Sequence, residues 1–201
     1  DDYVTYNRFT SVPEVGKNIG SGQGFFVRTI KSGIVSFDPS MILRGSNDQF
    51  FKVAKEKGSI EKNSLRINLC GSDNYFKQIV IGFDEKLTYQ LDSGYDALYL
   101  KGNQPIALYS ILDQSKLTIQ VLGSFNDQKI VKLGFDSEVE GLDMKIELSR
   151  KEGLLRDQGL LLLDSDHGIL HDLNSSPYNF IYEGSGSFED RFSLVFNSAV
   201  V

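Results

Sequence analysis

"SLRINL", residues 64–69, is the stretch that decides the fold class of this 201-residue chain. Apolar and polar residues alternate along it with a period of two. The apolar positions are Leu65, Ile67 and Leu69, and the polar positions are Arg66 and Asn68. Such alternation places the apolar side chains on one face of a β-strand and the polar ones on the other. The stretch therefore predicts a half-buried strand of an antiparallel sheet.

Similar stretches recur along the whole chain. Runs rich in Ile, Val, Leu, Phe and Tyr are expected to form strands at 24–29, 49–54, 64–70, 78–83, 97–100, 106–112, 116–122, 129–135, 144–148, 159–163, 178–182 and 191–196. Clusters of Gly, Asn, Asp and Ser separate these runs about every eight to twelve residues, which is typical of a β-sandwich. The prediction is an all-β fold, an antiparallel β-sandwich of the jelly-roll type.

Length and composition fit a globular domain with an apolar core. Hydrophobic residues make up 40% of the chain and charged residues 24%. We expect residues 1–201 to form one β-sandwich region, and a subdivision near the charged stretch 56–63 stays open. The net charge is −6, and Lys and Arg do not cluster, which argues against a nucleic-acid partner. No apolar run reaches the roughly 18 residues of a membrane helix, so no membrane span is expected.

Three closely spaced glycines, Gly20, Gly22 and Gly24, raise the question of a phosphate-binding loop. Such a loop presents backbone N–H groups at the start of a helix, and its dinucleotide form has the spacing G-x-G-x-x-G. Here the spacing is G-x-G-x-G, and the aromatic and β-branched residues 25–29 favour a strand. We therefore expect the glycines to allow a tight bend at the entrance of a strand.

The most polar stretch is "LLLLDSDHGILHDLNSS", residues 160–176, which holds both histidines of the chain. The Asp, Ser and Gly residues of 164–168 favour a hairpin turn, with one strand before it and a return strand from Ile169. Asp164 and Asp166 also offer carboxylate oxygens, which are the ligands that Ca²⁺ prefers. The hairpin is the favoured interpretation, and a Ca²⁺ site at Asp164 and Asp166 stays open beside it.

Residue types that carry catalysis form no defined set. Cys70 lies in a predicted strand without a neighbouring histidine, which indicates a structural thiol. Glu183, Glu189 and Asp190 supply carboxylates, and a glycosidase needs a pair of them facing each other across a cleft. Acidic residues that flank a strand are usually just solvated. We therefore predict no enzymatic activity, with a polysaccharide-active enzyme as the least favoured alternative.

Aromatic residues suggest a different kind of site. The chain has 9 Tyr, 14 Phe and no Trp, the residue on which sugars stack best. Tyrosines inside alternating strands are more often part of the core or its rim. Tyr75 and Tyr95 fall in predicted turns and are the candidate ligand-binding residues for a glycan.

An ordered series of short motifs runs along almost the whole chain. It comprises "IGSGQGFFVRTIKSGIVSF" (19–37), "QFFKV" (49–53), "SLRINL" (64–69), "QIVIGF" (78–83), "GYDALYLKG" (94–102), "ALYSIL" (107–112), "LTIQVL" (117–122), "VKLGF" (131–135), "LLLLDSDHGILHDLNSSPYNFIYEGSGSFEDRF" (160–192) and "SLVF" (193–196). In these motifs the chain resembles a region of large secreted proteins of Bacteroidetes, just upstream of their type IX secretion sorting domain.

The resemblance implies a β-sandwich module on a secreted or surface-attached protein, outside the cell. It implies that the chain is a fragment of a larger protein, which the type IX machinery exports as a whole. It names no catalytic residues. We accordingly expect a non-catalytic module for adhesion or ligand binding, with an extracellular glycan or surface protein as partner. The alternative is a structural or secretion-linked spacer.

Overall fold

The computed structural model of the chain describes residues 3–12, 18–29, 31–44 and 62–197. Contacts along the chain define two compact units, one of Asp1–Pro13 with Ile60–Val201 and one of Glu14–Ser59. The predicted strand at 49–54 lies outside the described residues, and so does the stretch 56–63 except for its last two residues. The single β-sandwich region over residues 1–201 stays a prediction.

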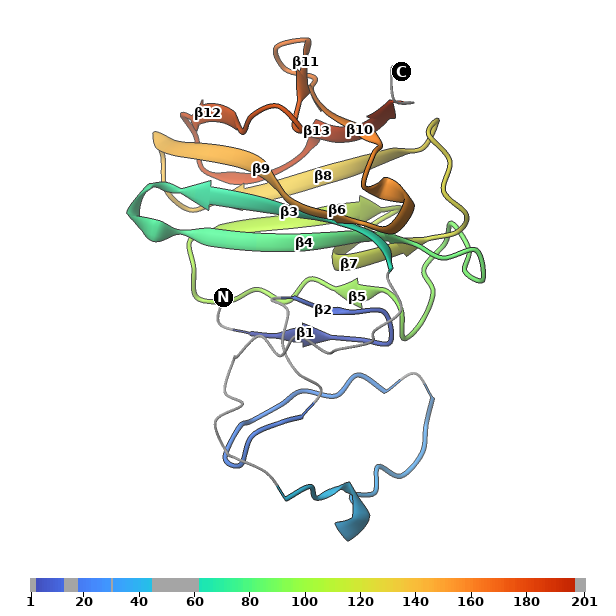
Figure 1. Cartoon of the computed structure of the whole chain (residues 1–201). Helices are drawn as coiled ribbons and strands as arrows, with labels where there is room; N and C mark the ends of the chain where they lie inside the picture. The colour runs from blue at the N-terminus through green and yellow to red at the C-terminus, as the bar shows by residue number, and fades with distance from the viewer. Residues whose placement is uncertain (1–2, 13–17, 30, 45–61, 198–201) are drawn as a thin grey trace. The chain divides into compact units, whose positions relative to one another are not determined.

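The larger unit is built almost entirely from strands (Figure 1). They are β1 (Thr5–Tyr6), β2 (Ser11–Val12), β3 (Asn63–Gly71), β4 (Phe76–Phe83), β5 (Ala97–Leu98), β6 (Ile106–Leu112), β7 (Ser115–Leu122), β8 (Ile130–Ser137), β9 (Leu142–Glu152), β10 (Gly159–Asp164), β11 (Ile169–Asp172), β12 (Tyr178–Tyr182) and β13 (Gly186–Asn197). Two short 3₁₀ turns, η2 (Ser72–Asn74) and η3 (Gly153–Leu155), interrupt them. The all-β prediction is confirmed.

One large sheet contains all of these strands except β1 and β2. Its strand order is β11-β10-β13-β8-β6-β7-β4-β3-β9-β12, and β5 pairs with β7 beside this path. The pairs are antiparallel except β4 with β7, which are parallel through partners such as Val80 and Ile119. A purely antiparallel sheet is therefore the wrong prediction at this pair. Strand β6 runs back along the sheet and a turn at residues 113–114 reverses the chain again, so β7 points the same way as β4.

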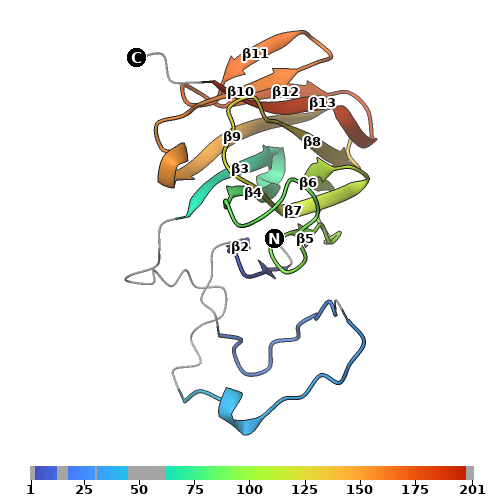
Figure 2. The same ribbon diagram turned by 90° about the vertical axis from the view of Figure 1, so that its right-hand side faces the viewer.

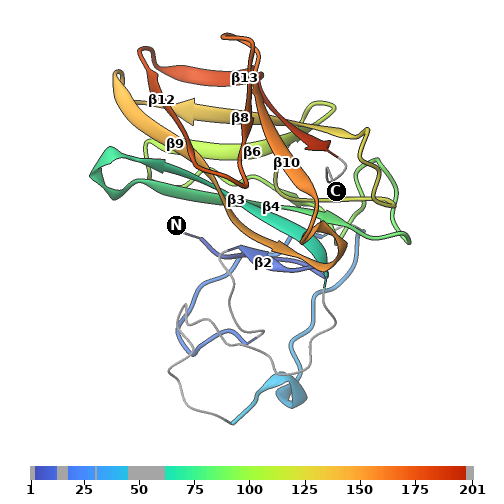
Figure 3. The ribbon, with the colours of Figure 1, turned by 45° about the horizontal axis from the view of Figure 1, so that its top comes forward.

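The large sheet curls until it is nearly closed into a barrel. Figure 2 shows β10, β11, β12 and β13 on one side of the sheet, with β3, β4, β6 and β7 on the other. In Figure 3, β12 and β13 again lie across from β3 and β4. The interior is filled by apolar side chains from alternate strand positions, among them Leu65, Ile67, Leu69, Ile79, Ile81, Leu133, Phe135, Leu160, Leu162, Phe192 and Leu194. The alternation predicted from "SLRINL" is thus confirmed, with its three apolar residues at most 1% exposed. The prediction that the strand is half-buried is wrong, because Arg66 and Asn68 on the other face are buried as well.

The N-terminal segment 3–12 covers part of the outer face of the sheet. A second, smaller core forms there from Phe9, Val12, Val80, Ile119 and Val121. Arg66 points to this face and is buried, because one of its amino groups donates to the Ser11 carbonyl and the other to Thr10 Oγ1, each at 3.0 Å. The sheet therefore has an apolar layer on both faces over β4 and β7.

The described residues of the smaller unit, 18–29 and 31–44, contain one regular element, the 3₁₀ turn η1 (Pro39–Met41). Asp38 caps it, since Oδ1 accepts a hydrogen bond of 2.8 Å from the Ser40 amide. The expected bend at the glycines is present, with Gly22 in the left-handed region at φ +83°. The predicted strand at 24–29 is wrong, because the chain there pairs with no other described residue in a ladder.

Candidate functional site

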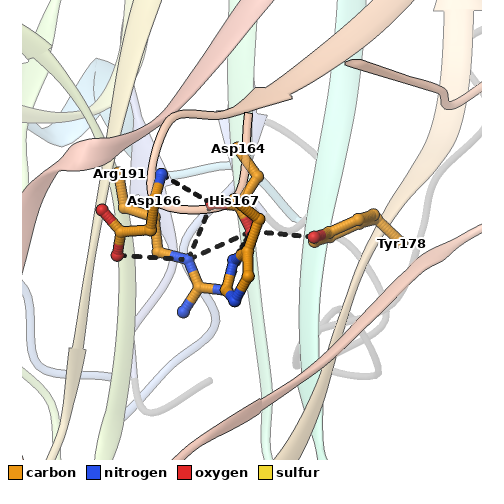
Figure 4. A network of polar contacts seen from close by, with 5 residues as sticks. All are labelled: Asp164, Asp166, His167, Tyr178 and Arg191. Atoms are coloured by element: carbon orange, nitrogen blue, oxygen red, sulfur yellow. Dashed lines mark hydrogen bonds and ion pairs between the residues drawn. The ribbon is translucent and has the colours of Figure 1, made fainter. Parts of the chain in front are cut away.

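The polar hairpin at 160–176 forms as predicted, with β10 ending at Asp164 and β11 beginning at Ile169. The side chain of Asp164 continues the inward row of Leu160 and Leu162 and is completely buried. Two side chains from other strands reach it there, Tyr178 of β12 and Arg191 of β13 (Figure 4). The sequence predicted Asp164 in the hairpin turn, whereas in the fold it is the last residue of β10 and lies at the end of the core.

Both carboxylate oxygens of Asp164 are occupied by partners in the chain. Arg191 donates from an amino group to Oδ2 at 2.8 Å and from Nε to Oδ1 at 3.1 Å. Tyr178 donates its hydroxyl to Oδ2 at 2.8 Å, and His167 Nδ1 lies 3.1 Å from the same oxygen. The backbone amide of Asp166 donates to Oδ1 at 3.1 Å. We call these five residues the Asp164 cluster.

The centre of the Asp164 cluster is an ion pair of Asp164 with Arg191 that is charged at neutral pH. Burial of the Asp164 carboxylate raises its pKa, but hydrogen bonds from Arg191 and Tyr178 and the positive charge of Arg191 lower the pKa more, to about 2. Burial lowers the pKa of Arg191, but the hydrogen bonds and the negative charge of Asp164 raise it by more. The pKa of Arg191 is therefore above its ordinary value. The guanidinium also lies over the rings of Phe180 and Phe192, at 4.9 and 4.7 Å from their centroids. Neither group changes its charge near neutral pH.

Asp164 and Asp166, the residues of the predicted Ca²⁺ site, differ in their surroundings. The Asp164 side chain is 0% exposed and that of Asp166 is 62% exposed. Arg191 contacts both, with Nε 3.8 Å from Oδ2 of Asp166, so a guanidinium supplies the positive charge that Ca²⁺ would bring. Among the described residues, no group of three or more His, Cys, Asp or Glu is placed to hold a metal ion. The Ca²⁺ site stays a prediction.

A bulge explains why sequence reasoning missed Arg191. Residues 189–191 of β13 lie opposite the single residue Gly134 of β8, and the ladder resumes on either side. The two additional residues change which side chains face inward, so strict alternation fails at this point. A usable signal was the position of Asp164, two residues after Leu162 in an inward row, because a buried carboxylate requires a cationic partner.

A second charged cluster lies on the outer face of β6, β7 and β8. Tyr109 donates its hydroxyl to Asp136 at 2.6 Å and accepts a hydrogen bond of 2.8 Å from Lys116. Lys116 also forms an ion pair of 2.9 Å with Glu189 of the bulge. Burial and the hydrogen bond to Asp136 raise the pKa of Tyr109. Burial lowers the pKa of Lys116, but its hydrogen bonds to Tyr109 and Glu189 outweigh this and raise it. Tyr109 therefore stays neutral and Lys116 charged.

The two candidate tyrosines lie apart. Tyr75 is half-buried and packs against the core inside the curled sheet. Tyr95 is half-buried and packs against the smaller core on the outer face, with the Arg8 guanidinium 5.9 Å from its ring centroid. The two cores lie on opposite faces of β4, since Ile79 belongs to one and Val80 to the other. The structure therefore does not combine Tyr75 and Tyr95 into one sugar-binding platform, and each stays a separate candidate.

An open groove with a volume of about 590 Å³ crosses β3, β9 and β12. Its lining residues are Cys70, Gly71, Ser72, Asp143, Met144, Lys145, Asn179, Phe180 and Ile181. On β9 and β12, the pairs Asn179 with Lys145 and Ile181 with Asp143 stand directly opposite each other. These four side chains point outward, because their strand neighbours Met144 and Phe180 belong to the interior core. The volume is in the range of about 300–1,000 Å³ that is usual for ligand sites.

Three polar side chains of this groove have no partner among the residues that the structure describes. Ser72, Asp143 and Asn179 are exposed, and within the described part of the chain their side chains make no hydrogen bond or ion pair. Ile181 is 55% exposed. Lys145 differs, since it pairs with Glu147 at 2.8 Å. Donors and acceptors thus remain available here beside an apolar side chain. Sequence reasoning missed the groove, because it depends on the pairing of β12 with β9.

Cys70 lies at one side of the groove. Its sulfur is 3.6 Å from a carboxylate oxygen of Glu147. Burial of the thiol and the negative charge of Glu147 raise the pKa of Cys70 above its ordinary value. A protonated thiol is a poor nucleophile, which agrees with the structural role expected for this residue.

Comparison with known proteins places this chain in a family. One family profile, described as a domain of unknown function (DUF8693), matches residues 1–196. Because the match spans nearly the whole sequence, the chain belongs to that family. A search of curated proteins and a search of solved structures each found no match. Within the described residues, no helix is long and apolar enough to cross a membrane.

Proposed function

We propose that this chain is a non-catalytic extracellular module that binds a glycan and serves in adhesion. The observation that carries the proposal is the contrast between its polar clusters. The Asp164 cluster and the cluster of Tyr109, Asp136 and Lys116 use their charges in internal pairs. In the groove across β3, β9 and β12, by contrast, the side chains of Asp143 and Asn179 have no partner among the described residues. An open groove with unused polar groups is the usual setting for a ligand.

Proton affinities support the non-catalytic assignment. A general acid or base works best when its pKa lies near the working pH. The pKa of Asp164 is about 2, and the pKa values of Tyr109 and Lys116 are raised above their ordinary values. These clusters are therefore suited to holding strands together rather than to moving protons.

The extracellular location rests on the resemblance to secreted Bacteroidetes proteins. In that setting the partner is a glycan or a surface protein, and the type IX machinery exports the full-length protein. A structural or secretion-linked spacer would need no groove with free polar groups, and this is why the binding role is preferred.

The test is binding of the purified chain to a broad glycan array, in Ca²⁺ and again in EDTA. We expect specific binding that persists in EDTA, because Arg191 already neutralises Asp164. Binding that disappears in EDTA would instead support the Ca²⁺ site at Asp164 and Asp166. An array without any specific signal in either buffer would contradict the proposed function and favour the spacer role.

A further inference from the structure

We infer that the groove across β3, β9 and β12 is the glycan site, and that it takes a neutral, hydroxyl-rich oligosaccharide. This inference rests on the proposed function and assigns it to particular residues. Ser72, Asp143 and Asn179 provide the hydrogen bonds, and Ile181 provides the apolar contact.

The polar groups of the groove match sugar hydroxyls. A hydroxyl both donates and accepts hydrogen bonds, a carboxylate only accepts, and a primary amide does both. Asn179 stands opposite Lys145 in the β9–β12 ladder, so Asp143, two residues before Lys145, is its diagonal neighbour on the same face. Diagonal neighbours on one face are about 7–8 Å apart, a gap that a sugar ring can span. Neighbouring hydroxyls of a sugar can therefore bridge Asp143 and Asn179.

Ile181 gives the site its apolar part. It stands opposite Asp143 and is 55% exposed, so a sugar lying on the two polar residues also covers its side chain. One face of a pyranose ring consists largely of C–H groups, and covering Ile181 with it removes apolar surface from water. The groove thus offers both kinds of contact that a sugar ring makes.

The charges of the groove favour a neutral sugar. Lys145 is neutralised by Glu147 at 2.8 Å, whereas Asp143 has no cationic partner within the described residues. The carboxylate of Asp143 would repel a uronate or sulfate group, because like charges placed together oppose binding. Neutral oligosaccharides are therefore the class that fits.

A chain of hydrogen bonds on the same face holds the floor of the groove in place. The Gln78 amide donates to Asn68 at 2.8 Å, and the Asn68 amide donates to Glu147 at 3.1 Å. Glu147 then pairs with Lys145, and this series of polar contacts ends there. Asn179 is the residue that stands opposite Lys145 in the ladder. The row holds Lys145 beside Asn179, whose amide has no partner among the described residues, so less of the groove has to be ordered when a ligand binds.

The experiment is a titration of the ¹⁵N-labelled chain, followed by NMR, with cellohexaose, xylohexaose, mannohexaose and chitohexaose. An oligogalacturonate serves as the anionic comparison. We expect at least one neutral sugar to shift the amide signals of Asp143, Lys145, Asn179 and Ile181. Asp143→Ala and Asn179→Ala should each weaken its binding about tenfold, as expected for a lost hydrogen bond. Asp190→Ala is the control, because it removes an exposed strand carboxylate outside the groove.

The outcomes separate this inference from the proposed function. A positive glycan array together with signal shifts only around Tyr95 would overturn the groove assignment and leave the function intact. Shifts caused by the oligogalacturonate alone would overturn the neutral class. A negative array together with no shifts from any sugar would overturn both. The spectrum of each variant away from the groove shows that it is folded.

Discussion

Asp164 and Asp143 are carboxylates on strands of the same sheet, and their surroundings give them opposite roles. Asp164 is completely buried and has a partner for each oxygen, whereas Asp143 is exposed and, within the described residues, has none. A buried carboxylate without a cation would cost several kcal/mol, so its partners have to come from the chain itself. An exposed carboxylate is hydrated and stays available. Burial therefore decides which carboxylates stabilise the fold and which can meet a ligand.

Strand β12 connects these two regions. Its inward residue Tyr178 donates to Asp164 of β10, and its outward residues Asn179 and Ile181 line the groove. In the strand order, β12 is at one end and β10 next to the other end, so the Asp164 cluster joins the two ends of the curled sheet through side chains. The cluster thereby fixes the strand that carries the groove. The following predictions test this division of roles.

The largest effect is expected for Asp164→Ala. The substitution leaves Arg191 buried without its counter-charge, which should lower the free energy of unfolding by about 3–5 kcal/mol. Urea unfolding followed by circular dichroism measures this change. Asp164→Asn, which keeps the shape of the side chain, should also destabilise the protein if the loss of charge is the cause.

Asp166→Ala is the matched control for the first prediction. Its carboxylate is 62% exposed and lies 3.8 Å from Arg191, so the expected change is below about 1 kcal/mol. Equal destabilisation by the two alanine variants would show that burial does not distinguish the two carboxylates.

The second prediction concerns pH. The pKa of Asp164 is about 2 in the folded protein and has an ordinary value of 3.8, so the folded state binds this proton less readily than the unfolded state. The resulting stabilisation, about 2 kcal/mol, is complete above pH 4 and is lost as the pH falls from about 4 to about 2. The difference in unfolding free energy between the wild type and Asp164→Asn should therefore shrink over that range. A difference that stays constant with pH would contradict the assignment.

The strand patterns were predicted well because they depend on local alternation. In β3, the inward positions Leu65 and Ile67 follow directly from the period of two. The stretch 24–29 has equally strong strand residues but lacks a strand partner among the described residues, and propensity alone does not supply one. The parallel pairing of β4 with β7 was also missed. The direction of β7 relative to β4 depends on how often the chain reverses between the two strands, which the pattern of a single strand does not show.

The sites were predicted less well because they depend on contacts distant in sequence. Asp164 was predicted in the hairpin turn, whereas it is the last residue of β10, and it is buried against Tyr178 and Arg191 on two other strands. Arg191 faces inward only because of the bulge at 189–191. The groove arises where β12 meets β9, and this pairing is invisible in either strand alone.

The smallest effect on stability is expected for Asn179→Ala, which is best compared with Tyr178→Phe on the same strand. Tyr178→Phe removes a hydrogen bond of 2.8 Å to a buried charge and should cost about 1–2 kcal/mol of unfolding free energy. Asn179 is exposed, and its side chain has no partner within the described residues, so its truncation should change stability by less than about 0.5 kcal/mol. The two variants, measured side by side by urea unfolding, therefore distinguish the faces of β12. If Asn179→Ala proved as destabilising as Tyr178→Phe, the outward face would be structural too, and the argument for a ligand site in the groove would lose its basis.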